Sequence, residues 1–448
     1  MIRSAIDWRL RFGMIWLGQS VSLFGSVLTQ FVLVWWITET VGTGVALATA
    51  ALAATAPQVL LGPVAGTLVD RWNRRAVMLV ADALAALCIA LLIGLFAAEM
   101  AEVWHIYGLL AARSVLQAFH QPAAGASTTL LVPTSQLARV AGLNQLVNGL
   151  SSVAAAPLGA LALGLWSLEG ALLIDVVTAL AGIVPLLVFA IPQPPAVHEP
   201  APPAFWGELR AGLSFVWRWP GLRLLLGLGM LVSAMANAAY ALQPLIVRVA
   251  YGGDVSAVAL IESFTGIGMV AGGLALSTWG GFRRRVVSCL AGIAGIGLGQ
   301  TLTGAAPQDA FWLAVSGGLA LGLALPFAHA PLATVIQERV PAAMQGRVLG
   351  LLNSVLGLAG PVGLVVAGPL ADAVGVRVLY IGGGLAIVLL ALAGSASTTL
   401  MDMEQSAPLV VSGGARVMAV GGARSGGIEQ GLEPRRRETR ETDARHLG

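Results

Sequence analysis

Long apolar runs separated by short polar breaks make up almost the whole chain. A membrane-spanning helix needs about 20 mostly apolar residues. Twelve runs satisfy this length, at roughly 12–37, 44–69, 76–98, 104–131, 143–167, 170–191, 223–247, 255–279, 286–306, 309–335, 348–370 and 376–398. The one long connection, 192–222, is rich in Pro and separates six runs from six. The pattern predicts an all-α membrane protein with twelve transmembrane helices.

The composition supports this prediction. Of the 448 residues, 57% are hydrophobic and 10% are charged, whereas about 25% charged residues is typical of soluble domains. All 25 basic residues are Arg, and the lack of Lys excludes a P-loop nucleotide site and a Schiff-base cofactor. Cys88 and Cys289 have no metal-site spacing, and the loops contain no nucleophile elbow or paired carboxylates. We therefore expect no enzyme activity, no metal, no cofactor and no nucleic-acid partner.

The Arg residues are distributed unevenly between the two sets of connections. With a cytoplasmic N-terminus, fifteen of them fall on the cytoplasmic side, and only Arg248 and Arg377 fall in outer loops. Cytoplasmic loops carry an excess of Arg, so both termini are predicted to be cytoplasmic and the first helix to be an uncleaved anchor. The predicted parts are a six-helix bundle at 1–191, a cytoplasmic Pro-rich linker at 192–222, a second bundle at 223–398 and a disordered cytoplasmic tail at 399–448.

The two halves repeat each other at fixed points. The His-x-Pro run at His120 recurs 209 residues later at His329, and the Arg-Val-x-Gly-Leu run at Arg139 recurs 208 residues later at Arg347. Parallel repeats of six helices are typical of transporters in which two bundles move about a central site. The two bundles are therefore predicted to be pseudo-symmetric. Both His residues are expected to close their helices just before Pro.

Several segments carry a family resemblance. The segments Gly62-Pro-Val-Ala-Gly-Thr-Leu-Val-Asp-Arg-Trp-Asn-Arg-Arg75 and Arg113-Ser-Val-Leu-Gln117 resemble signatures of the major facilitator superfamily. The His-x-Pro and Arg-Val-x-Gly-Leu runs and the segment around Glu262 resemble its drug:proton antiporter branch, which includes macrolide-efflux proteins and the enterobactin exporter. The resemblance implies a monomeric multi-pass transporter of the bacterial cytoplasmic (inner) membrane, whose partners are the lipid bilayer, protons and a small-molecule substrate.

The resemblance also implies a cytoplasmic gate at the first signature, formed by Gly66, Asp70, Arg71, Arg74 and Arg75. Gly66 would permit close contact between helices. In the family, the acid at the position of Asp70 faces the start of helix 11, and a helix N-terminus attracts an anion. The alternative is that Asp70 and the Arg residues only anchor the topology.

Polar residues form stripes on three predicted helices. Helix 4 has Arg113, Gln117 and His120 at i, i+4 and i+7, and therefore on one face. Helices 1 and 7 have comparable stripes, at Gln19, Ser22, Ser26 and Gln30 and at Ser233, Asn237 and Tyr240. The resemblance implies that helices 1, 4, 7 and 10 line a central cavity. The predicted cavity residues are Gln30, Arg113, Gln117, Asn237 and Tyr240, with interhelical hydrogen bonding as the alternative role.

Three acids lie inside apolar runs. Proton coupling needs a carboxylate that changes its charge as access alternates between the two sides. Glu262 in helix 8 is the first candidate and Asp175 in helix 6 the second. Asp82 and Asp175 lie on helices that the resemblance assigns to the outer scaffold, so structural pairing is also expected there, with Arg113 as a partner for Asp175.

These observations predict a secondary active transporter that exports a small amphipathic compound, such as a drug, antibiotic or siderophore-like metabolite, by proton antiport with alternating access. A proton-coupled importer of a small solute and a non-transporting receptor on the same scaffold remain open alternatives. A cavity Arg favours a polar or anionic amphiphile over a strongly cationic one.

Overall fold

The computed structural model describes residues 7–193, 205–340 and 342–405. These residues form helices and short connections, without a strand among them. The N-terminal helices are α1 (Trp8–Thr40), α2 (Gly44–Val69), α3 (Arg74–Ala97), α4 (Val103–Leu131), η2 (Thr134–Gln136), α5 (Leu137–Leu165) and α6 (Leu168–Val188). They are followed by α7 (Phe205–Arg218), α8 (Pro220–Ala241), α9 (Gln243–Tyr251), α10 (Val255–Trp279), α11 (Arg285–Ala305), η3 (Gln308–Ala310), α12 (Phe311–Arg339), α13 (Ala342–Val374), α14 (Val376–Ala396), α15 (Thr398–Met401) and η4 (Met403–Gln405).

Polar caps set the start of several of these apolar helices. The side chains of Thr43, Asn73, Ser167 and Asp254 each accept a hydrogen bond from a backbone N–H in the first turn of α2, α3, α6 and α10. Such caps satisfy backbone donors that have no partner within the helix. The helix boundaries therefore follow from the polar residues between the apolar runs.

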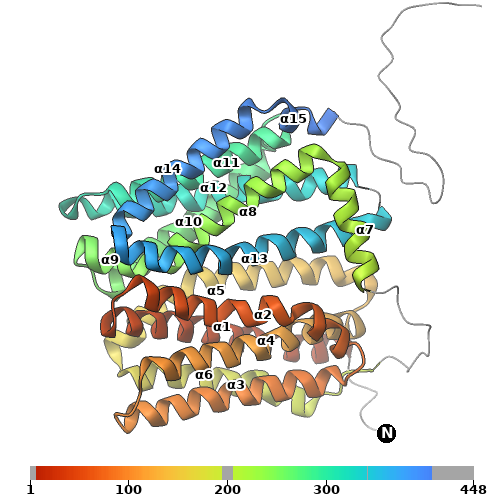
Figure 1. Cartoon of the computed structure of the whole chain (residues 1–448). Helices are drawn as coiled ribbons and strands as arrows, with labels where there is room; N and C mark the ends of the chain where they lie inside the picture. The colour runs from red at the N-terminus through yellow and green to blue at the C-terminus, as the bar shows by residue number, and fades with distance from the viewer. Residues whose placement is uncertain (1–6, 194–204, 341, 406–448) are drawn as a thin grey trace, which may run out of the picture. The chain divides into compact units, whose positions relative to one another are not determined.

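The helices of the two halves pack in the same pattern. In the first half α4 packs on α2 and α3, and α6 packs on α1 and α3; in the second half α12 packs on α10 and α11, and α14 packs on α8 and α11 (Figure 1). The two halves meet where α2 packs on α13 and α5 packs on α10. The repeated packing agrees with the repeat seen in the sequence.

Small residues bring the helices of the second half into close contact. A Cβ atom added to Gly322 on α12 would lie 2.0 Å from the backbone oxygen of Thr265 on α10, and one added to Gly292 on α11 would lie 2.3 Å from the backbone nitrogen of Ala328 on α12. Such approaches are possible only where the side chain is absent, and they are typical of helix contacts in membranes.

Eleven helices in the described part of the chain are long and apolar enough to cross a membrane: α1, α2, α3, α5, α6, α8 and α10 to α14. The fold is therefore that of an all-helical, multi-pass membrane protein. The remaining predicted span, 104–131, is the 29-residue helix α4. Its Arg113, Gln117 and His120 lower its mean hydropathy, and α4 is not among the eleven.

The prediction that His120 and His329 close their helices is wrong. Helix α4 continues through Pro122 to Leu131, and α12 continues through Pro331 to Arg339. A Pro inside a helix removes one backbone donor, and neighbouring helices in a membrane protein compensate for that loss. His120 therefore lies in the middle of α4, where it faces the interior of the first half.

The predicted linker and tail are only partly described. Residues 194–204 of the linker lie outside the described residues, and 205–218 form α7. Helix α8 begins at Pro220, a residue that is favourable at the first position of a helix. Of the predicted tail, residues 399–401 lie in α15 and 403–405 in η4, and 406–448 lie outside the described residues.

Candidate functional site

A polar cavity of about 680 Å³ lies inside the first half, between α1, α2, α3, α4, α5 and α6. Its lining extends from Phe12 near the start of α1 to Leu33 near its end. The polar and charged lining residues are Gln19, Ser20, Ser22, Ser26, Thr29, Gln30, Gln58, Asp82, Arg113, Ser114, Gln117, His120, Gln121, Ser127, Thr128, Asn144, Asn148 and Asp175. Inward-facing polar groups at membrane depth are typical of a water-filled pathway.

Helices α4 and α6 bring Arg113 and Asp175 together as an ion pair on the cavity wall. The guanidinium of Arg113 donates to one carboxylate oxygen, and the hydroxyl of Ser26 on α1 donates to the other at 3.2 Å. Asp175 is buried, and a buried carboxylate needs such donors because it has left water. The expected pairing of these two residues is confirmed, and the positive charge of Arg113 is neutralised locally.

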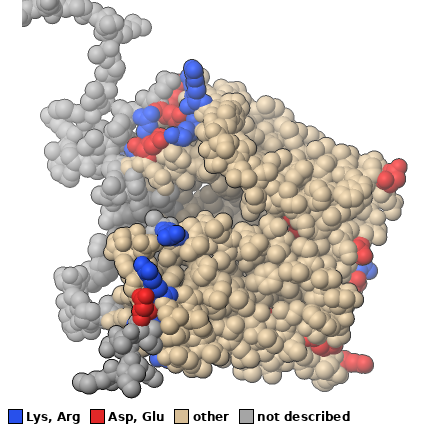
Figure 2. Space-filling model, turned by 180° about the vertical axis from the view of Figure 1, so that it is seen from behind, with Lys and Arg blue, Asp and Glu red and all other residues tan. Residues whose placement is uncertain are grey.

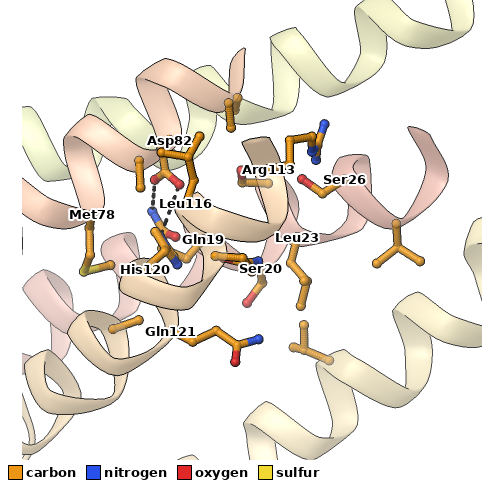
Figure 3. Close-up of a pocket in the computed structure, with 18 of the residues that line it drawn as sticks. Gln19, Ser20, Leu23, Ser26, Met78, Asp82, Arg113, Leu116, His120 and Gln121 are labelled. Carbon is orange, nitrogen blue, oxygen red and sulfur yellow. Dashed lines mark hydrogen bonds and ion pairs between the residues drawn. The ribbon is translucent and has the colours of Figure 1, made fainter. Parts of the chain in front are cut away.

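A second pair of ionisable side chains lies on the same wall (Figure 3). The Nε2 atom of His120 on α4 lies 3.2 Å from Oδ1 of Asp82 on α3. The amide of Gln19 on α1 donates to Oδ2 of the same carboxylate at 2.8 Å and to the backbone oxygen of Gly182 on α6 at 3.3 Å. The side chains of His120 and Asp82 are mostly buried, with 14% and 12% of their surface exposed. Four helices therefore hold one carboxylate between an imidazole and an amide.

The structure divides the predicted cavity residues between the two halves. Gln30, Arg113 and Gln117 line the cavity of the first half. Asn237 and Tyr240 lie on α8 in the second half and are not among the described residues that line it. The amide of Asn237 donates to the backbone oxygen of Ser233 at 2.7 Å.

The predicted proton-coupling residue Glu262 lies on α10, partly buried, next to Tyr240 on α8. The two side chains are close enough to interact electrostatically, so these two predicted residues lie together in the second half. The other predicted coupling residue, Asp175, is the partner of Arg113. Glu262 is not one of the described residues that line the cavity of the first half.

The predicted gate residues lie at the end of the molecule where α2 ends, called here the Asp70 end. The Asp70 side chain is 73% exposed and lies 3.9 Å from Arg74. A Cβ atom added to Gly66 would have no described atom within 4 Å, so the close helix contact expected at this glycine is not found among the described residues. Arg71 is exposed. Arg75 donates to the backbone oxygens of two residues in the last turn of α6, Leu186 and Leu187, at 2.5 and 2.8 Å.

The opposite end, where α2 begins and α13 ends, is closed; it is called here the Asp372 end. The carboxylate of Asp372 on α13 accepts hydrogen bonds from the backbone N–H groups of Gly44 and Val45 at 2.5 and 3.0 Å. A Cβ atom added to Gly44 would lie 2.7 Å from the backbone oxygen of Gly368. Sequence reasoning missed Asp372. The available signal was the Gly-x-x-x-Asp spacing of Gly368 and Asp372, which repeats that of Gly66 and Asp70.

The two ends also differ in charge. Figure 2 shows Arg side chains gathered at one end of the molecule and mainly acidic side chains at the other. One ion pair at the Asp372 end, between Glu39 on α1 and Arg248 on α9, joins the two halves at 4.0 Å. Both of its side chains are exposed, with 54% and 42% of their surface accessible, so this pair contributes little.

Comparison with known proteins identifies the family. Residues 15–364 match the sequence model of the Major Facilitator Superfamily. The chain belongs to this superfamily. Macrolide efflux protein A of Streptococcus pyogenes is 32% identical over 387 residues, which cover 86% of this chain and 95% of the relative. Multidrug efflux pump Tap of Mycolicibacterium fortuitum is 25% identical over 390 residues, which cover 82% and 90% of the two chains.

Solved structures support the fold. A mutant of the nucleoside transporter NupG superposes with a TM-score of 0.67 at 13% identity, covering 87% of this chain and 99% of that one. At this identity the likeness concerns the fold alone. Together the family and the efflux relatives make the protein a membrane transporter related to drug-efflux proteins, and not an enzyme.

Proposed function

We propose that the protein exports a small amphipathic compound across the bacterial cytoplasmic membrane by proton antiport with alternating access. The observation that carries this proposal is the polar cavity of about 680 Å³ between the six helices of the first half. It coincides with contact between the halves at the Asp372 end and with open space beside Gly66 at the Asp70 end. A cavity with one closed end is what alternating access requires.

The two ends of the α2–α13 contact act as the gates. In the state described here, Asp372 stabilises the closed end through the N-terminus of α2. Asp70 is exposed and, among the described residues, has only the 3.9 Å contact with Arg74, so it is able to make the equivalent contact with the N-terminus of α13 after the bundles tilt. Arg75 takes a separate role, because its contacts with the end of α6 hold that helix in place.

The Arg-rich end faces the cytoplasm, together with both termini. This orientation follows the excess of Arg on cytoplasmic sides and the charge distribution in Figure 2. Helix α4 is the twelfth span. Its charged residue Arg113 is compatible with membrane depth because Asp175 is its partner and both line the cavity. On this orientation the cavity is open to the cytoplasm and ready to take a compound for export.

The coupled proton is carried by Glu262. This acid lies on α10, which packs on α5 at the contact between the halves, so a tilt of the bundles changes the surroundings of its helix. The relatives suggest a macrolide as the first compound to test, since one of them is named for macrolide efflux.

The test measures accumulation of a radiolabelled macrolide in a bacterial strain that lacks its own drug pumps. We expect less accumulation when the protein is present, and loss of that effect after a protonophore is added. Asp70→Asn should abolish export at normal expression, whereas Asp309→Asn, an exposed acid in η3, should not change it. Raised accumulation would indicate an importer, and unchanged accumulation of macrolides and other amphiphiles would reject transport.

A further inference from the structure

The charged groups on the cavity wall leave a net charge that depends on one side chain. The described lining residues that carry or can carry charge are Asp82 on α3, Arg113 and His120 on α4, and Asp175 on α6. Helices α1, α2 and α5 contribute only neutral side chains to the lining. Two carboxylates and one guanidinium sum to one negative charge, and a protonated His120 brings the sum to zero.

The two pairs differ in whether they can exchange a proton with water. A guanidinium does not release its proton, so the Arg113–Asp175 pair keeps a fixed charge of zero. An imidazole takes up and releases a proton close to neutral pH. Of the two pairs, only Asp82–His120 can therefore change its charge under ordinary conditions. Since both of its members line the cavity, that change of charge alters the electrostatic interaction with a compound bound there.

We propose that the Asp82–His120 pair is a protonation site of this cavity and selects a lipophilic monocation as the compound that binds there. The cavity is negative and attracts the cation while His120 is neutral. It becomes neutral and releases the cation after the His120 nitrogen takes one proton from the aqueous side. This inference rests on the proposed export function. The pair would be a second protonation site besides Glu262, which lies on α10 and is not among the described lining residues.

The neighbours of Asp82 suit this role. The amide of Gln19 holds Oδ2 of the carboxylate at 2.8 Å, so that Oδ1 stays directed at the His120 nitrogen in either protonation state. Gly182 leaves room for this arrangement, because a Cβ atom there would lie 3.2 Å from the Gln19 amide nitrogen. The position of Arg113 also changes the expected substrate. Its charge is balanced by Asp175, and the cavity does not favour anions.

The test measures binding of tetraphenylphosphonium to the purified full-length protein from about pH 5 to 8, the range in which an imidazole titrates. This cation has no proton of its own, so any pH dependence belongs to the protein. Below the midpoint, affinity should fall with acidification by up to about tenfold per pH unit, as linkage to one proton requires. Tetraphenylborate, which has the same shape and the opposite charge, should not bind more tightly at high pH.

Two substitutions of the pair should act in opposite directions. His120→Gln fixes the negative charge and should bind the cation with the same affinity at every pH. Asp82→Asn removes that charge and should weaken binding roughly tenfold or more throughout. A pair with only a structural role would lose binding in both variants. His329→Gln, in the second half, is the matched control and should keep the full pH dependence.

Three results would overturn the site: pH-independent binding by the wild type, pH dependence that survives His120→Gln, or pH dependence that is lost only in Glu262→Gln. Failure of the export proposal is recognised separately. If proteoliposomes transport no compound while cation binding still titrates through His120, transport is rejected and the site is supported. If a macrolide is transported while cation binding ignores pH, this inference alone is rejected.

Discussion

Replacing Asp372 with Asn should open the end of the molecule that the structure shows closed. The carboxylate is the acceptor for two backbone N–H groups at the start of α2, on the opposite half of the protein. Asn keeps the size of the side chain and one acceptor oxygen but removes the negative charge. The change therefore isolates the attraction between that charge and the N-terminus of α2.

The size of the effect follows from these two hydrogen bonds. A hydrogen bond to a charged group contributes about 1.5–3 kcal/mol where it is shielded from water, and the helix N-terminus adds about 0.3–1 kcal/mol. The bond to Gly44 is partly buried and the bond to Val45 is exposed, so we expect about 1–3 kcal/mol in total. At about 1.4 kcal/mol per factor of ten, the equilibrium should shift roughly 5- to 100-fold toward the open form.

The assay is single-molecule fluorescence energy transfer between two dyes attached through Met100→Cys and Asp309→Cys. Both positions are exposed and lie in connections of the two halves at the Asp372 end. Cys88 and Cys289 are the only cysteines in the sequence, so Cys88→Ser and Cys289→Ser give a background for labelling. Asp372→Asn should increase the population with widely separated dyes. Glu39→Gln is the matched control, because it removes an exposed ion pair at the same end. Equal opening in both variants would refute the role given to the α2 N-terminus.

Two further predictions concern stability, both measured as the thermal denaturation midpoint in detergent. Gly322→Ala should destabilise the protein by about 1–3 kcal/mol, since the new methyl group overlaps the backbone of Thr265. The control is Gly94→Ala, which should change the stability little because its new methyl group has no described atom within 4 Å. Arg113→Gln should cost about 3–5 kcal/mol by leaving buried Asp175 unpaired, and the double variant Arg113→Gln/Asp175→Asn should recover most of that loss. A single variant as stable as the double one would contradict the second prediction.

The helices could be predicted from the sequence because a membrane span has a fixed length and composition. The departures have local causes. The run at 223–247 is divided into α8 and α9, since Pro244 restarts a helix after Leu242. Helix α7 lies within the predicted linker. The sequence did not predict it because the Pro residues before it drew the whole segment into a linker assignment. The His-x-Pro runs did not end their helices, because packing between neighbouring helices outweighs the loss of one backbone donor.

The contacts of the site could be predicted from the sequence only where a residue requires a partner of opposite charge. A buried Arg needs a counter-ion, so the pairing of Arg113 with Asp175 followed from charge alone. The pairing of Asp82 with His120 did not, because it depends on the rotation of α3 and α4 about their axes and on the continuation of α4 past Pro122. The contact of Asp372 with the start of α2 joins the two halves, and the hydropathy pattern does not show how the two halves meet.

In the proposed mechanism, the α2–α13 pair links the closing of one end to the opening of the other. The two helices are antiparallel, because Gly44 at the start of α2 lies against Gly368 near the end of α13. Each has a Gly-x-x-x-Asp sequence in its last turns, so each is able to place a carboxylate at the N-terminus of its partner. Near the middle, a Cβ atom added to Gly357 on α13 would lie 4.0 Å from Val59 on α2, and we place the pivot of the proposed tilt at this contact. Tilting about it separates one carboxylate from its helix end as it brings the other into contact. A substrate or proton then needs to change the balance between two weak contacts by only a few kcal/mol to reverse the populations.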